Sequence, residues 1–561
     1  MKLSRVLPFL LMGLLLMGAD EPANRDEYMA SMRENLQRFQ KVYQYLVFRY
    51  VDEINPEATI EAAIHGMLDE LDPYTDYFIE EEAESLDEMT RGEYGGLGMQ
   101  VGQRGSTKRL TVISPFEDSP AWKAGLLPGD VITEIDGLST TDEKLSDVVK
   151  HMKGEPGTQV TITVERPGYE TPLVYTLTRE MIAIQDLKFA GMIDKSQGLG
   201  YVRLTGFSGK ATESLRKALI DLNAQGLNKL VLDLRGNPGG LLREAVGVSD
   251  LFLPVGARIV ETRGRDDEIL KEYTSENDPI FTGELVLLVN QGSASASEIV
   301  SGAIQDLDRG VIVGTNTYGK GLVQSVVSLD SNSKVKLTTA KYYIPSGRLI
   351  QRIDYFEDNK VLYHINKGEP VDSLFHTDQG RVVIGGRGIL PDVEQEPEAW
   401  PFFVSELWRS NLFINFLTDR EREGHAIAKT KVNAALLSEF QTFIQKSEFT
   451  FKPSGSEQLE ELEKIVEREG YGSPVADALI SLRQKLEGDP EQHFVQNQEW
   501  IERLLTSEIL SRSEGQDART LYALSYDRQF DAAQRLLTAG EDQYRATLRP
   551  VVTTALEESA R

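Results

Sequence analysis

The middle of the chain reads Leu285-Val286-Leu287-Leu288-Val289-Asn290-Gln291-Gly292-Ser293-Ala294-Ser295-Ala296-Ser297-Glu298. Its first five residues form an apolar run that is typical of a buried strand. Apolar residues then recur at helical spacing, at Ile299, Val300, Ala303, Ile304 and Leu307. The small residues in between predict a tight strand-to-helix turn, where backbone amides converge and favour negative charge. An oxyanion would be stabilised there.

A second segment, Tyr318-Gly319-Lys320-Gly321, places a glycine-flanked lysine 25 residues after Ser295. This combination indicates a serine/lysine hydrolase. A lysine amine can act as a general base when burial and the lack of a carboxylate partner lower its pKa from about 10.4. None of the six histidines lies between residues 152 and 363, so a Ser-His-Asp triad or a histidine metal cluster has no local support.

A third segment, residues 232–242, has the sequence LDLRGNPGGLL. It predicts another strand-turn-helix junction, whose glycines let backbone amides approach a ligand closely. It lacks the glycine followed by Lys and Ser/Thr of a Walker phosphate loop.

Each of these segments also has a purely structural interpretation. Ser295 and Glu298 have the S-x-x-E spacing of a helix capping box. Lys320 could be a solvated turn residue, and the glycine-rich segment could be an ordinary α/β connection. The sequence pattern alone leaves these alternatives open.

Composition excludes several classes of function. A length of 561 residues predicts several domains. The net charge of −28 argues against nucleic acid as a partner, because binding a phosphate backbone needs clustered Lys and Arg. The absence of cysteine removes disulfides, thiol catalysis and cysteine-bound zinc. We expect neither a metal nor a cofactor.

The start of the chain is typical of a signal peptide. Lys2 and Arg5 precede an apolar stretch at residues 6–17, which is shorter than the ~20 residues that span a bilayer. We therefore expect a signal peptide at residues 1–19 and a periplasmic or otherwise extracytoplasmic protein. Membrane association through an uncleaved N-terminal segment is the alternative.

The rest of the chain predicts a multidomain α/β protein. Residues 20–91 show helical spacing, and residues 92–180 alternate short β-branched runs with turns, as in a compact β-rich module. Strands and helices alternate through residues 181–396, which favours an α/β core. Residues 397–561 form an acidic, mainly helical C-terminal extension.

Six strings of this sequence resemble the carboxyl-terminal processing proteases, also called tail-specific proteases. They are YGGLGMQV (94–101), SPAWKAGLLPGDVITEIDG (119–137), LDLRGNPGG (232–240), NQGSASASEI (290–299), GTNTYGKGLVQ (314–324) and TTAKYYIPSGRLI (338–350). They occur in the family's order and lie within residues 45–393. The resemblance implies a PDZ domain at residues 92–180, followed by a crotonase-like serine protease core.

The resemblance also implies roles for individual residues. Ser295, the middle serine of its run, would be the nucleophile, and Lys320 would be the general base. Gln324 would help to hold the lysine. The implied oxyanion donors are the backbone amides of Ala296 and of Gly239 or Gly240.

In a PDZ domain, a loop such as Gly96-Leu97-Gly98 offers amides to the terminal carboxylate of a peptide, which adds as a strand to a sheet edge. Candidate walls of an apolar side-chain pocket are Met99, Val101, Val148 and Met152. The alternative is that these four residues belong to the core of the module.

Together these features predict a secreted serine endopeptidase that recognises free, apolar C-termini of proteins or peptides. A catalytically silent peptide-binding scaffold is the alternative from another class. A crotonase-like acyl-transforming enzyme has less support, because the sequence shows no coenzyme signal. The C-terminal extension could be a dimerisation arm, a lid, an adaptor-docking surface or a solvated appendage, so a homo-oligomer and an adaptor protein are both candidate partners.

Overall fold

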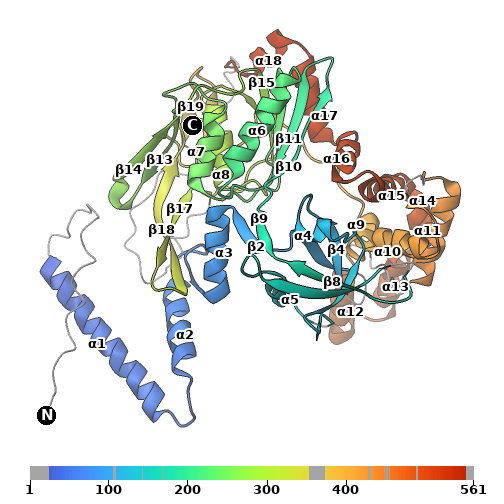
Figure 1. Ribbon diagram of the computed structural model, residues 1–561, viewed down its shortest axis with the longest axis horizontal. Helices are drawn as coiled ribbons and strands as arrows, with labels where there is room; N and C mark the ends of the chain where they lie inside the picture. Colours follow the sequence, from blue (N-terminus) through green and yellow to red (C-terminus); the bar gives the residue numbers. More distant parts are fainter. Residues whose placement is uncertain are drawn as a thin grey trace.

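The computed structural model describes residues 25–550 except 105–108, 142, 167–168, 353–372, 428–430, 448, 450, 452, 454 and 488–489. The expected signal peptide at residues 1–19 lies outside the described residues. Figure 1 shows an α/β body with a β-rich module and C-terminal helices beside it, and N-terminal helices that extend from it. The multidomain α/β class is confirmed, whereas the domain boundaries after residues 91, 180 and 396 stay predictions.

A six-stranded sheet in the order β10-β11-β12-β15-β16-β21 forms the centre of the body. The strands are β10 (Leu187–Asp194), β11 (Leu199–Leu204), β12 (Lys229–Asp233), β15 (Glu284–Val289), β16 (Val311–Gly314) and β21 (Val393–Glu394). The pair β10 and β11 is antiparallel, and the other neighbours are parallel. Parallel strands that are covered on both faces need unbroken apolar runs, and every residue from Leu285 to Val289 is fully buried.

Helices from distant parts of the chain cover the two faces of this sheet. They are α6 (Ala211–Ala224), α7 (Leu242–Asp250) and α8 (Ala296–Asp306) on one face, and α17 (Arg528–Thr538) and α18 (Glu541–Thr547) on the other. Alternate residues of β15 take part in the two cores: Leu285 and Leu287 in the first, Val286 and Leu288 in the second. The C-terminal helices thus return to the body, as Figure 1 shows.

A second, antiparallel sheet has the order β1-β18-β13-β14, with β17 also paired to β18. The strands are β1 (Asp76–Ile79), β13 (Arg258–Arg263), β14 (Ile269–Thr274), β17 (Leu322–Ser328) and β18 (Ser333–Tyr343). A short 3-10 helix, η1 (Arg265–Asp267), precedes β14. Because β1 and β17 both pair with β18, the residues before β1 lie against the turn that carries Lys320.

The β-rich module is a sheet in the order β3-β4-β5-β7-β8, with β6 paired to β5, and a separate pair of β2 and β9. The strands are β2 (Glu93–Gly96), β3 (Met99–Arg104), β4 (Arg109–Pro115), β5 (Val131–Ile135), β6 (Leu138–Ser139), β7 (Gln159–Glu165), β8 (Leu173–Thr178) and β9 (Glu180–Ala183). Two helices, α4 (Pro120–Lys123) and α5 (Leu145–Met152), accompany them. Among the described strands, β3 pairs only with β4, so its other edge is open.

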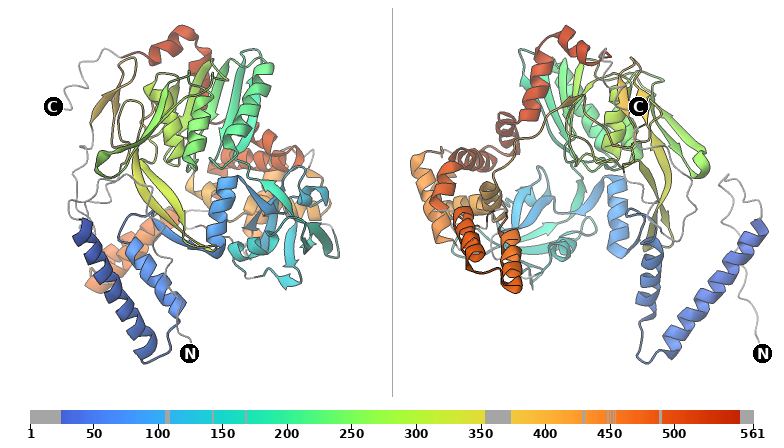
Figure 2. Two further views of the ribbon diagram at one scale, coloured as in Figure 1. Left: turned by 60° about the vertical axis from the view of Figure 1, so that its left-hand side comes forward. Right: turned by 180° about the vertical axis from the view of Figure 1, so that it is seen from behind.

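Helices form the two ends of the described chain. At the N-terminal end they are α1 (Arg25–Arg49), α2 (Pro56–Leu68) and α3 (Glu80–Arg91). At the C-terminal end they are α9 (Phe402–Arg409), α10 (Leu412–Arg422), α11 (Ala434–Lys446), α12 (Ser456–Glu469), α13 (Ser473–Glu487), α14 (Pro490–Gln496), α15 (Gln498–Ser513) and α16 (Gln516–Leu524), before α17 and α18. A hairpin of β19 (Leu374–His376) and β20 (Val382–Ile384) precedes them. Both views in Figure 2 show α1 standing away from the body. None of the described helices has both the length and the apolar character that crossing a membrane requires.

Candidate active site

Ser295 lies at the junction between β15 and α8, where it occupies the N-cap position of the helix. Its φ of 55° and ψ of −112° form an uncommon conformation for a residue with a side chain. Such a conformation persists only when the surrounding structure holds it in place, and it is typical of functional sites.

The three serines of this turn have different environments. Ser293 and Ser297 are fully buried, and their hydroxyls donate to the carbonyls of Leu234 (2.8 Å) and Asn237 (2.9 Å). Ser295 between them is partly exposed. The flanking serines therefore fix the turn, while the middle serine is the one that a substrate can reach.

Glu298 connects the serine turn to the lysine turn. One oxygen of its fully buried carboxylate accepts from the N–H groups of Ser295 (2.8 Å) and Lys320 (2.9 Å). The other accepts from the Gly319 N–H (2.7 Å) and the Thr317 hydroxyl (2.5 Å). Burial raises the pKa of Glu298 to about 7, although these hydrogen bonds oppose the rise. The S-x-x-E spacing thus marks a helix start, and the same carboxylate also holds the lysine turn.

The Lys320 amine lies over the ring of Tyr74, with Nζ 4.1 Å from the ring centroid. The pKa of Lys320 is lowered to about 8, chiefly by burial and also by the charge of the nearby Lys336, whereas the carboxylates of Asp72 and Glu298 act in the opposite direction. Among the described residues the amine forms no ion pair. A lysine with this pKa is partly neutral near pH 7, as a general base must be.

The turn that carries Tyr74 is built by Asp72. Its carboxylate accepts from the N–H groups of Tyr74 (2.8 Å) and Thr75 (3.0 Å), and from the Thr75 hydroxyl (2.9 Å). The Thr75 hydroxyl in turn accepts from the Thr338 N–H of β18 (3.1 Å). Tyr74 also reaches Tyr318, with 3.3 Å between the two hydroxyls. An N-terminal turn is therefore fixed against the lysine.

Gln324 lies on β17, four residues after Lys320. Its amide donates to the Thr338 hydroxyl (3.3 Å) on β18, next to an irregularity in strand pairing between Val323 and Gln324. Within the described parts of the chain, the Lys320 amine is hydrogen-bonded neither to Gln324 nor to the Ser295 hydroxyl. The structure therefore brings Ser295 and Lys320 to one site, because Glu298 binds the backbone N–H of both residues. The Gln324 amide is directed instead to Thr338 on the neighbouring strand β18.

Tyr342 of β18 contacts both the serine turn and the lysine turn. Its fully buried hydroxyl lies 3.2 Å from the Ser295 carbonyl and also contacts the Lys320 carbonyl. Burial raises the pKa of Tyr342 well above its usual value, so the hydroxyl keeps its proton and remains a donor.

The glycine-rich turn after β12 packs against the serine turn. A methyl group added at Gly239 would lie 2.9 Å from both Ala296 N and Ser295 Cβ, so only glycine permits this approach. The Gly239 N–H donates to Asn237 Oδ1 (2.9 Å). Among the described residues, the N–H groups of Gly240 and Ala296 have no acceptor. These two are therefore free to bind an oxyanion.

The predicted peptide-binding residues of the β-rich module lie together around β3 and α5. The carbonyls of Leu97 and Gly98 accept from Ala121 N (2.9 Å) and Phe116 N (2.8 Å), while the N–H groups of Leu97 and Gly98 have no acceptor among the described residues. Gly98 has a φ of 71°, and Gly96 pairs with Glu180. The remaining candidates contribute to the module's core, with Val148 and Met152 buried and Met99 and Val101 partly buried.

Sequence reasoning missed Tyr74, Asp72 and Tyr342 and saw Glu298 only as a helix cap. For Glu298 the S-x-x-E spacing was the available signal. Tyr342 lies in the quoted string TTAKYYIPSGRLI, but nothing in that string indicates contact with Ser295. Tyr74 is 246 residues from Lys320, and no local pattern connects them.

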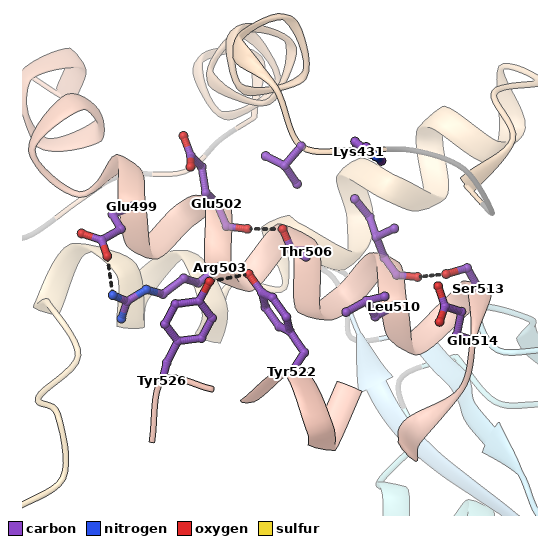
Figure 3. Close-up of a pocket in the computed structure, with 12 residues that line it drawn as sticks. Lys431, Glu499, Glu502, Arg503, Thr506, Leu510, Ser513, Glu514, Tyr522 and Tyr526 are labelled. Atoms are coloured by element: carbon purple, nitrogen blue, oxygen red, sulfur yellow. Dashed lines mark hydrogen bonds and ion pairs between the residues drawn. The ribbon is translucent and has the colours of Figure 1, made fainter. Parts of the chain in front are cut away.

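A separate cavity of about 530 Å³ lies in the C-terminal helices, mainly between α15 and α16. Figure 3 shows Arg503, Tyr522 and Tyr526 on its wall. It includes none of the residues around Ser295. Within the described residues, no group of histidine, aspartate and glutamate side chains is placed to hold a metal ion.

Comparison with known proteins connects this geometry to a family. The pattern of peptidase family S41 matches residues 198–361. A carboxy-terminal-processing protease of Bartonella bacilliformis is 38% identical over 355 residues, which cover 62% of this chain and 80% of the relative. This chain belongs to peptidase family S41. As a member of family S41 it is a serine-type peptidase, and the S41 match contains the serine, lysine and glycine-rich turns described above.

Other parts of this S41 peptidase match further patterns, named PDZ domain (residues 111–166), activating protease CtpB N-terminal domain (16–82) and probable PDZ-protease, C-terminal helical domain (403–537). A probable CtpA-like serine protease of Staphylococcus saprophyticus is 33% identical over 334 residues, covering 59% of this chain and 66% of the relative. The solved structure of a photosystem II D1 C-terminal processing protease is 30% identical, with a TM-score of 0.35, and the match covers 65% of this chain and 88% of that one.

Changing Glu298 tests the connection between the two turns. In Glu298→Gln, an amide NH₂ would replace one acceptor oxygen and face N–H donors, so we expect kcat to fall about 10- to 100-fold. We also expect a lower melting temperature, measured by thermal unfolding. Glu213→Gln on the exposed side of α6 is the matched control and should leave both unchanged. Wild-type kcat in Glu298→Gln would contradict this role.

Proposed function

We propose that this S41 peptidase hydrolyses peptide bonds with a dyad of Ser295 and Lys320. The observation that carries the proposal is the shared contact of Glu298, which binds the backbone N–H of both residues. One buried carboxylate thereby fixes the nucleophile and the base in relation to each other. The lowered pKa of Lys320 supports its role as the base.

The reaction would begin when the Lys320 amine leaves the Tyr74 ring and takes the proton of the Ser295 hydroxyl. The serine oxygen attacks the peptide carbonyl, and the N–H groups of Ala296 and Gly240 bind the developing oxyanion. Protonated Lys320 then gives its proton to the leaving amine. Water, activated by the same amine, would hydrolyse the acyl-enzyme and restore Ser295.

We further propose that the PDZ domain selects substrates with a free, apolar carboxyl terminus. Two features of the described part of the chain support this: no acceptor there pairs with the N–H groups of Leu97 and Gly98, and no strand there pairs with the outer edge of β3. A terminal carboxylate would accept hydrogen bonds from those N–H groups while the peptide pairs with β3. Met99 and Val101, which are only partly buried, would contact the apolar side chains of the peptide.

The test compares two peptides of one sequence, ending in a free carboxylate or in an amide. Because the amide cannot form charge-assisted hydrogen bonds with the loop, we expect its kcat/KM to be about 10- to 100-fold lower. Binding of both peptides to Ser295→Ala, measured by fluorescence polarisation, separates recognition from cleavage. Equal turnover of the two peptides would contradict the proposal that the PDZ domain selects substrates by their free carboxylate. Binding without any turnover by the wild type would favour a silent scaffold.

We propose an extracytoplasmic location on the basis of the basic and apolar residues 2–17, which are typical of a signal peptide. Protein or peptide substrates are the partners that the PDZ domain and the protease family support. A homo-oligomer and an adaptor bound to the C-terminal extension stay as proposals.

A further inference from the structure

The last two described helices are part of the protease core. Phe530, Ala533 and Leu537 of α17 and Tyr544 of α18 are buried against the face of the central sheet opposite α8. The Tyr544 hydroxyl donates to the Leu285 carbonyl (2.9 Å) and accepts from the Leu285 N–H (3.0 Å), at the start of the strand that leads to Ser295. These helices therefore complete the sandwich that supports the nucleophile.

The start of α17 also binds Arg235, the first residue of the glycine-rich turn. The Arg235 guanidinium donates to both carboxylate oxygens of Asp527 (3.0 and 2.6 Å) and to the Gln529 side-chain oxygen (2.9 Å). On the other side it donates to Asp233, whose carboxylate is buried and also accepts from the Tyr201 hydroxyl (2.6 Å). The Nη1 group of Arg235 has described partners only in the C-terminal segment.

Arg235 in turn begins the segment that touches the nucleophile. The next residue, Gly236, donates to Asn290 Oδ1 (2.9 Å). The Asn237 carbonyl accepts from the Ala294 N–H (3.0 Å) and the Ser297 hydroxyl (2.9 Å), on either side of Ser295. A displacement of Arg235 would therefore be transmitted to the turn that carries Gly239 and Gly240.

We propose that Asp527 and Gln529 are positioning residues for catalysis, which hold the glycine-rich turn in place by binding Arg235. This inference rests on the proposed function, because it matters only if the turn supplies an oxyanion donor. Asp527 is suited to this because it is already fixed, as the N-cap of α17, by the N–H groups of Gln529 (3.0 Å) and Phe530 (3.1 Å). The C-terminal extension would thereby act on the chemistry without touching the substrate.

The test is Asp527→Asn in the full chain. Asparagine is as good an N-cap as aspartate, so α17 is retained, while the charged bond to Arg235 is lost. We expect kcat to fall roughly 10- to 100-fold with KM unchanged, because the substrate-binding groups are untouched while the oxyanion donors shift. The pH at which activity rises should stay near that of the wild type, because Lys320 is not affected.

Asn433→Ala is the matched control, because Asn433 caps α11 by accepting from Leu436 N (3.0 Å) and has no described contact with Arg235. It should lower the melting temperature and leave kcat unchanged. Wild-type kcat in Asp527→Asn, or an equal loss in Asn433→Ala, would overturn the proposal. If Asp527→Asn does not fold, Gln529→Met removes one Arg235 contact and is judged by the same criteria. Turnover by Ser295→Ala would instead refute the proposed dyad, so the two failures are distinguishable.

Discussion

Replacing Ser295 by alanine is expected to lower kcat/KM for a peptide with a free carboxyl end by at least about 10⁴-fold. The Ser295 hydroxyl is the proposed nucleophile, and loss of a nucleophile that acts as a unit with its base removes most of the catalysis. The melting temperature should fall only modestly: alanine keeps the backbone N–H that binds the Glu298 carboxylate and loses only the hydroxyl that caps α8. Peptide hydrolysis measured by mass spectrometry, with thermal unfolding in parallel, checks both expectations.

Ser297→Ala is the matched control for this experiment. It removes a buried hydroxyl that donates to the Asn237 carbonyl, two residues from Ser295. We expect it to lower the melting temperature and to reduce kcat/KM by no more than about tenfold. A larger loss of activity in Ser297→Ala than in Ser295→Ala would contradict the assignment of Ser295 as the nucleophile.

The second large effect is expected for Lys320→Met, which should lower kcat/KM by at least about 10³-fold. In the wild type, activity should rise with pH through about 8, because the amine can accept a proton only after losing its own. With a pKa of about 8, about a tenth of the amine is neutral at pH 7. The residual activity of Lys320→Met should lack this rise, which a pH profile of kcat/KM measures.

Lys336→Met gives the matched control for the pH profile. The Lys336 charge helps to lower the pKa of Lys320, so its removal should move the rise in activity to higher pH while the maximum is preserved. An unchanged profile in Lys320→Met would refute the assignment of the base.

Local sequence pattern was enough to predict the strand and helix on either side of Ser295. The apolar run Leu285 to Val289 lies in β15, and the helical spacing that begins at Ile299 lies in α8, with Leu307 at its C-cap. Burial leaves a visible signal in both: an unbroken apolar run in the strand, which is covered on both faces, and apolar residues at helical spacing in the helix. The position of Lys320 in a turn was likewise predictable from its glycines.

The surroundings of the lysine were not predictable in this way. Pairing of β1 with β18 brings Tyr74 to Lys320, and packing of α17 brings Asp527 to Arg235. These contacts join residues more than 200 positions apart, and single hydrogen bonds or ring contacts leave no periodic signal. The role implied for Gln324, holding the lysine, came from the family resemblance. A resemblance between sequences does not show the irregularity in strand pairing between Val323 and Gln324.

If the contact between Arg235 and Asp527 positions the glycine-rich turn as proposed, it also sets when the enzyme can become active during its synthesis. Asp527 lies 207 residues after Lys320, and ribosomes add about 5–20 residues per second. A growing chain would therefore have both reactive side chains for about 10 to 40 s before Asp527, the proposed positioning residue, is made. During this delay the nascent protease would have low activity, which would protect the other proteins of the cell that makes it.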